Sequence, residues 1–217
     1  MSKSAAELQE LLASFPPDAP SANQTRLYRA VRWLARAEES VDDPDVQFIL
    51  LWITFNALYA DDLRGVEETF HGRIRQFFDQ VVDLDTTKEL HSLIWTTFSN
   101  SVRVLLDNKY AYNGFWKDVS GRGGQRDWST DFVRANQRAR DALGLGKTSV
   151  VLEVVFERLY TIRNQLVHGG ATYQSSVNRA QVLDGARILA SVVPVILELV
   201  MRKPYGDFGA IMYPVVD

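Results

Sequence analysis

The sequence lacks cysteine, and it holds only three histidines among its 217 residues. Disulfide bonds and thiolate chemistry are therefore excluded, and a zinc site would need its ligands from His, Asp and Glu alone. His71, His91 and His168 lie far apart in the chain. None of them has a second His or a carboxylate at the His-Glu-x-x-His spacing that holds zinc on a helix. We accordingly expect neither a bound metal nor a cofactor.

Long hydrophobic runs are also missing. The two longest apolar stretches, 48–55 and 188–201, are shorter than the roughly 20 residues that a membrane-spanning helix needs. The first residues are polar and lack the apolar core of a secretory signal. We therefore predict a cytoplasmic protein with no membrane partner.

No charge of one sign dominates the chain. The net charge is −3 and the sequence pI is about 5.7, which argues against a general nucleic-acid coat protein. Residues 117–140 are an exception, because six basic residues against three acidic ones give a local charge of +3. This segment is either a solvated helix face with a loop or a local basic cleft.

The sequence has no stretch of alternating apolar and polar residues between turn signals, so we predict no β-sheet. Apolar residues instead recur every three to four positions, which predicts an all-α protein. Asp43 and Pro44 fit the N-cap and first turn of a helix that is apolar nearly all round, and this helix should lie at the centre of a bundle. The expected helices cover residues 4–15, 21–40, 44–60, 66–82, 86–107, 129–143, 149–168 and 176–202.

Residues 108–126 depart from this helical pattern. They combine several aromatic residues with a glycine-rich run, so we predict an aromatic-anchored loop that ends in a flexible tip. Arg122 and Arg126, with Tyr112 and Trp116 nearby, would form a flap that contacts RNA through charge and stacking.

The most informative stretch is the end of the helix expected over 149–168. Arg163 and Asn164 lie just off its buried stripe, and His168 follows Asn164 by four residues, one turn later on the same face. Gly169-Gly170 should end the helix with a residue in the left-handed conformation. Arg offers a fork for phosphate oxygens, His exchanges protons near neutral pH, and Asn orients either one. Together they indicate phosphate chemistry.

A structural interpretation of the same residues stands beside this one. Arg163 would be the surface ion-pair partner of Glu157 or Asp184, and His168 would only cap the helix. The chain would then be a helical bundle with no active site at this end.

The pattern Arg163-Asn164-x-x-x-His168-Gly169, on the penultimate long helix of an all-helical chain, resembles the signature of the HEPN superfamily, an Arg and a His separated by a few residues. An apolar helix around 51–59 and a long final helix are similar to that family as well. The domain organisation implied by the resemblance is an N-terminal helix and linker at 1–20, an HEPN-like helical domain at 21–202 with an elaboration at about 108–147, and an irregular tail at 203–217.

The resemblance implies a metal-independent endoribonuclease that acts on RNA as a homodimer, with Arg163, Asn164 and His168 as catalytic residues. It also implies a toxin or anti-phage setting, with an antitoxin or defence-system protein as a partner. In HEPN toxins silenced by nucleotidyltransferases, a Tyr usually follows the motif His by two residues. That position is Gly170 here, and the nearest Tyr is Tyr173, which argues against such a modification.

Two further alternatives belong to the resemblance. Some HEPN proteins are non-catalytic, so a module that binds RNA, nucleotide or a protein partner is the alternative function. Asn56 is a polar residue inside the apolar helix. It either positions the catalytic residues without touching the substrate, or is a buried amide whose hydrogen bonds are made by the backbone or a neighbouring side chain.

Overall fold

The computed structural model describes residues 2–59, 68–123, 127–176, 179–209, 211, 213 and 214. Within these ranges every regular element is helical and no strand is present, which confirms the all-α prediction. The chain divides into two compact units, Met1–Glu89 with Val182–Asp217, and Leu90–Gln181. In the described ranges, no helix combines the length and the apolar character that crossing a bilayer requires.

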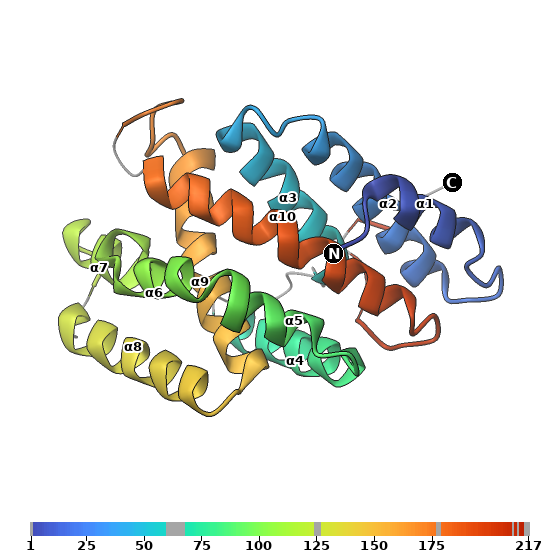
Figure 1. Cartoon of the computed structure of the whole chain (residues 1–217). Coiled ribbons are helices and arrows are strands. Elements are labelled where there is room, and N and C mark those ends of the chain that lie inside the picture. The colour runs from blue at the N-terminus through green and yellow to red at the C-terminus, as the bar shows by residue number, and fades with distance from the viewer. Residues whose placement is uncertain are drawn as a thin grey trace. The chain divides into compact units, whose positions relative to one another are not determined.

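The first unit is built on a layer of neighbouring helices in which α2 packs against both α1 and α3 (Figure 1). Ser4 and Glu7 fix the start of α1, because the Ser4 hydroxyl accepts the Glu7 N–H and the Glu7 carboxylate accepts the Ser4 N–H. The helices of this unit are α1 (Ala5–Ala13), α2 (Ser21–Glu38), α3 (Pro44–Tyr59), α4 (Glu68–Leu84) and most of α10 (Arg179–Met201).

The start of α3 confirms the predicted cap. Asp43 Oδ1 accepts the N–H of Val46 at 3.2 Å, and Pro44 is the first helical residue. The helix then buries apolar side chains on more than one of its faces, as its composition predicted. They are Phe48, Leu51, Trp52, Phe55 and Leu58.

A buried cation ties the C-terminal segment to this layer. The guanidinium of Arg26 on α2 donates to the carbonyls of Leu58 at 2.7 Å, of Phe208 at 3.0 Å and of Gly209. It also lies 5.9 Å from the centre of the Phe208 ring. Asn23, one turn earlier on α2, donates to the carbonyls of Pro204 and Gly206 at 2.9 Å each. Residues from the tail beyond α10 thus complete the first unit.

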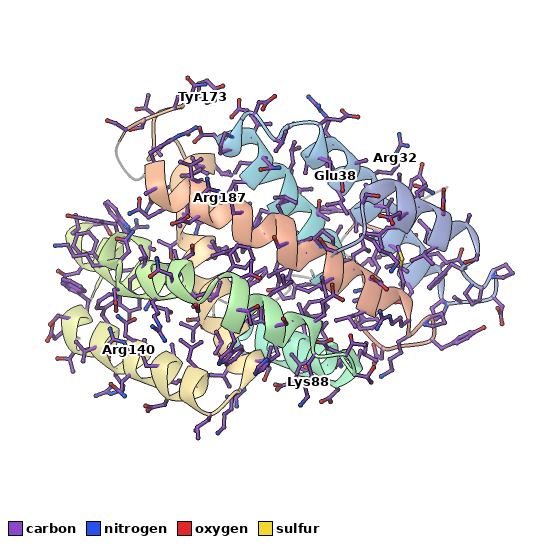
Figure 2. All side chains as sticks on the ribbon, in the orientation of Figure 1. Arg32, Glu38, Lys88, Arg140, Tyr173 and Arg187 are labelled. Atoms are coloured by element: carbon purple, nitrogen blue, oxygen red, sulfur yellow. The ribbon has the colours of Figure 1, made fainter. Side chains whose placement is uncertain are left out.

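The second unit has α9 at its centre, in contact with α6, α8 and the short helix η2. The first half of α9 is buried on every side, from Val151 to Phe156. Arg140 on α8 donates to Asp107 at the end of α6 at 2.6 Å, which joins those two helices (Figure 2). The elements are α5 (Glu89–Ser92), η1 (Leu93–Thr97), α6 (Ser99–Asp107), η2 (Lys109–Ala111), α7 (Asn113–Val119), α8 (Trp128–Gly144) and α9 (Thr148–Val167).

The single helix predicted over 86–107 is wrong in its middle. A π-helical turn, η1, separates α5 from α6, and the Phe98 N–H donates to the carbonyl of Leu93 five residues back. The Thr96 hydroxyl donates to the carbonyl of Ser92 at 2.5 Å and so competes for the backbone acceptors of the turn.

The loop predicted for 108–126 is also wrong, since η2 and α7 occupy 109–111 and 113–119. Phe115 is the reason, because its ring makes edge-to-face contacts with Tyr110, Trp116 and Trp128 at centroid distances of 5.1–5.3 Å. This burial of aromatic surface orders the segment. The glycine-rich run that begins at Gly121 was predicted to form a flexible tip, and its last part, residues 124–126, lies outside the described residues.

Candidate functional site

The motif lies at the C-terminal end of α9, where the chain turns sharply. His168 is the first residue beyond the helix, and its N–H donates to the carbonyl of Asn164 at 3.0 Å. Gly169 follows with a φ of +70°, a left-handed conformation that glycine adopts without strain, and this confirms the predicted glycine stop. The Ala171 N–H then donates to the carbonyl of Gln165 at 3.0 Å. The turn therefore folds back against the last turn of α9.

The side chains of Arg163 and Asn164 contact each other. Arg163 Nη1 donates to Asn164 Oδ1 at 3.0 Å, and both residues are half-buried. A guanidinium carries five N–H donors, so this bond positions the group and leaves further donors for a ligand. Among the described residues of its own unit, Arg163 forms no ion pair, and the expected alternative pairing with Glu157 is not present there.

His168 presents an exposed imidazole one turn beyond Asn164. In the described part of its unit, no hydrogen bond engages that ring. The capping contribution comes from the backbone of His168 and the conformation of Gly169. A half-buried guanidinium, that of Arg163, and an exposed imidazole, that of His168, therefore lie on the last turn of α9 and its cap.

Sequence reasoning missed the partner of Gln165, which stands inside the motif. Its side-chain amide donates to the backbone carbonyl of Tyr110 at 2.7 Å, and the Trp116 indole N–H donates to the same carbonyl at 2.8 Å. Two side chains thus fix one backbone oxygen. The last turn of α9 and the aromatic segment 109–119 are held in register by this oxygen. A polar residue within the motif was the available signal.

The residues predicted to form an RNA-contacting flap have different surroundings. Tyr112 is half-buried, and burial raises the pKa of its phenol, with Arg158 opposing the rise. Trp116 is partly exposed, and Arg122 is exposed with its Nε bonded to the Ser120 hydroxyl at 3.1 Å. Arg126 lies outside the described residues. RNA contact by these four residues stays a prediction.

Arg158 is a second arginine on α9 that the sequence did not mark. It is 2% exposed, with its guanidinium 4.5 Å from the Tyr112 ring centre and 5.3 Å from that of Phe132. Its Nη2 donates to Asn136 Oδ1 at 3.0 Å. Burial lowers the pKa of this guanidinium to about 10, so it stays charged near neutral pH.

Asn56 lies on α3 in the first unit and is half-buried, whereas the motif lies in the second unit. Its predicted support of the catalytic residues stays a prediction. In the described ranges, no group of three or more His, Asp or Glu side chains is arranged to hold a metal ion. Comparison of the chain with protein families, curated proteins and solved structures gives no match.

Proposed function

We propose that this chain is a metal-independent endoribonuclease of HEPN type, which cuts RNA through a site assembled from two copies of the chain. Arg163, Asn164 and His168 are its catalytic residues. It acts in the cytoplasm as part of a toxin or anti-phage system, where an antitoxin or defence-system protein is a partner. The resemblance of the motif to HEPN proteins supplies the reaction class, and the geometry at the end of α9 supports it.

One observation carries the proposal. Arg163 is oriented by a 3.0 Å hydrogen bond to Asn164 and has no ion-pair partner among the described residues of its unit, while the imidazole of His168 stands exposed at the cap of the same helix, one turn beyond Asn164. Arg158 on the same helix differs, because it is buried between two rings and its Nη2 donates to Asn136. The cation and the imidazole are therefore available to a phosphate ligand.

The chemistry needs one base and one acid. The base takes the proton from a ribose 2′-hydroxyl, whose oxygen attacks the adjacent phosphorus, and the acid gives a proton to the departing 5′-oxygen. The P–O5′ bond breaks, and the products are a 2′,3′-cyclic phosphate and a 5′-hydroxyl. Each chain offers one histidine at this site, so a two-fold dimer that brings two His168 side chains together supplies both groups. Arg163 stabilises the negative charge that develops on the phosphate oxygens.

Cleavage of a mixed RNA in the presence of EDTA tests the proposal. We expect the wild type to produce fragments ending in 2′,3′-cyclic phosphate. His168→Ala and Arg163→Ala should each slow cleavage by at least about 100-fold. Arg187→Ala is the matched control, because this exposed arginine on α10 pairs only loosely with Asp184, at 3.7 Å (Figure 2).

The outcomes separate the proposal from its alternative. RNA that stays intact with the wild type, yet is retained by it, would favour a non-catalytic binding module. Cleavage that survives both substitutions would place the activity elsewhere and remove the basis for these residue assignments. Size-exclusion chromatography with light scattering tests the dimer directly, since a monomer at catalytic concentrations contradicts the two-histidine site.

A further inference from the structure

The aromatic segment that Gln165 holds carries an exposed, unassigned surface. Tyr110 is 42% exposed and Trp116 is 37% exposed, although both rings contact the ring of Phe115. The Lys109 ammonium lies 5.2 Å from the centre of the Tyr110 ring and forms no ion pair with any described residue of its unit. We call Lys109, Tyr110 and Trp116 the aromatic platform.

We propose that the aromatic platform binds unpaired bases of single-stranded RNA next to the end of α9. This inference adds a binding surface to the proposed ribonuclease and rests on that function for the role of the bound strand. Base faces stack on exposed aromatic rings whatever their sequence, and a lysine beside them neutralises a phosphate. Bases in a duplex are already stacked, so the platform selects single strands.

The platform is rigid, which favours a binding role over incidental exposure. Phe115 holds Tyr110 at an interplanar angle of 89° and Trp116 at 84°, and Trp128 buttresses Phe115 from α8 at 84°. In Figure 1 the helix that carries Trp116, α7, lies beside α8, which it contacts. Rings that are fixed before binding lose little conformational freedom when a base stacks on them.

The local charge matches a nucleic acid. Residues 108–123 contain the three basic residues Lys109, Lys117 and Arg122 against one acidic residue, Asp118, which gives +2. The neighbouring Asp107 is paired with Arg140 at 2.6 Å and adds little negative field. The cores of protein–protein interfaces are depleted in lysine, whereas here the exposed Lys109 lies next to the rings, 5.2 Å from the centre of the Tyr110 ring.

The backbone carbonyl oxygen of Tyr110 fixes the position of the aromatic platform relative to the last turn of α9. The Tyr110 carbonyl accepts from Gln165 at 2.7 Å and from Trp116 at 2.8 Å, so both the ring that stacks and the turn that carries Arg163 are fixed to the same atom. A strand whose base stacks on Trp116 is therefore held by a side chain that is hydrogen-bonded to the same oxygen as the last turn of α9, which carries Arg163.

Binding is measured without cleavage so that this inference is tested separately from the enzyme. The probe is a fluorescently labelled 2′-O-methyl oligouridine, about 12 nucleotides long, within the range of single-strand site sizes. It has no 2′-hydroxyl to attack phosphorus. Fluorescence anisotropy gives its affinity for the full chain, and the same oligonucleotide annealed to its complement gives the duplex affinity.

We expect Trp116→Ala and Tyr110→Ala each to weaken single-strand binding by about tenfold, while Trp116→Phe keeps most of the affinity. Trp33→Ala is the matched control, because Trp33 lies on α2 in the first unit and is 41% exposed. Lys109→Gln, a change at an exposed side chain, should make the salt dependence of binding shallower by about 0.7 in log–log slope.

Several results would overturn the inference. They are unchanged affinity in Trp116→Ala, an equal loss in Trp33→Ala, equal binding of the duplex, or no binding of the oligouridine. If Trp116→Ala fails to fold, Tyr110→Ala and Lys109→Gln decide the matter. Binding that depends on the platform residues, without any cleavage of RNA, would contradict the proposed ribonuclease and support the binding role of the aromatic platform. Cleavage of RNA, with binding that does not change when the platform residues are substituted, would support the ribonuclease and contradict the binding role of the platform.

Discussion

Arg158 and Arg163 lie five residues apart on α9 and have opposite surroundings. Arg158 is 2% exposed, lies against the rings of Tyr112 and Phe132, and donates to Asn136. Arg163 is half-buried and contacts the neighbouring Asn164 side chain at 3.0 Å. The fold encloses the first guanidinium between two rings, with one hydrogen bond and a buried Nε that has no hydrogen-bond partner among the described residues. The second guanidinium is only half-buried, and one hydrogen bond to a neighbouring side chain orients it.

The difference teaches that residue type and helix position do not reveal which arginine the fold buries and which it leaves partly exposed. Both side chains belong to one helix of one unit. What separates them is the number of partners that the folded chain supplies. Burial lowers the pKa of Arg158 to about 10, and the nearby charges of Glu157 and Tyr112 oppose that shift.

The largest effect on stability should come from removing the buried arginine. Arg158→Ala empties the space between two rings and leaves the buried Asn136 amide without its donor, so we expect a loss of about 3 kcal/mol in the free energy of unfolding. Arg163→Ala should change it by no more than about 0.5 kcal/mol. Urea unfolding followed by circular dichroism measures both.

Arg158→Met refines that comparison. It should lose less than Arg158→Ala, because a long apolar side chain still fills the space between the rings. Equal losses for Arg158→Ala and Arg163→Ala would mean that the two arginines do not differ as their contacts suggest.

A smaller effect is expected from the ring beside Arg158. Tyr112→Leu keeps apolar bulk but removes the face that lies 4.5 Å from the guanidinium, so we expect a loss of about 1–2 kcal/mol. Tyr28→Leu is the control, because Tyr28 lies on α2 and is exposed. The double variant with Arg158→Met completes a mutant cycle. Strictly additive losses would show that the ring and the cation do not interact.

The smallest effect tests the cap that presents His168. Gly169→Ala should cost about 1 kcal/mol, because φ is +70° there and an added Cβ would meet no atom within 4 Å, so only backbone strain is introduced. Gly144→Ala at the end of α8, where space is equally open and φ is not positive, should cost nothing. If both alanines are tolerated equally in thermal unfolding, the left-handed residue does not constrain this turn.

Much of the fold followed from the sequence, because helical periodicity and turn residues are local signals. The cap of α3 at Asp43 and the left-handed Gly169 were both predicted from single residues and are confirmed. The π-helical turn η1 and the helix α7 were not predicted, since the first depends on hydroxyl competition and the second on how Phe115 packs in three dimensions.

For the site, the sequence placed Arg163, Asn164 and His168 at the end of one helix, where the structure has them. The bond between Gln165 and the Tyr110 carbonyl joins residues 55 apart in the chain, and no spacing rule reports such a contact. The catalytic roles themselves stay predictions for the cleavage assay.

The clamp around Arg26 has a consequence for the order of events during synthesis. Arg26 finds one acceptor at Leu58, but its bond to Phe208 reaches across 182 residues of later chain. While the ribosome makes the intervening helices, the Arg26 guanidinium on α2 lacks the carbonyls of Phe208 and Gly209, because these residues have not yet been synthesised. The first unit therefore completes its core only after the second unit, Leu90–Gln181, has been synthesised. The second unit has time to fold before the first unit is complete.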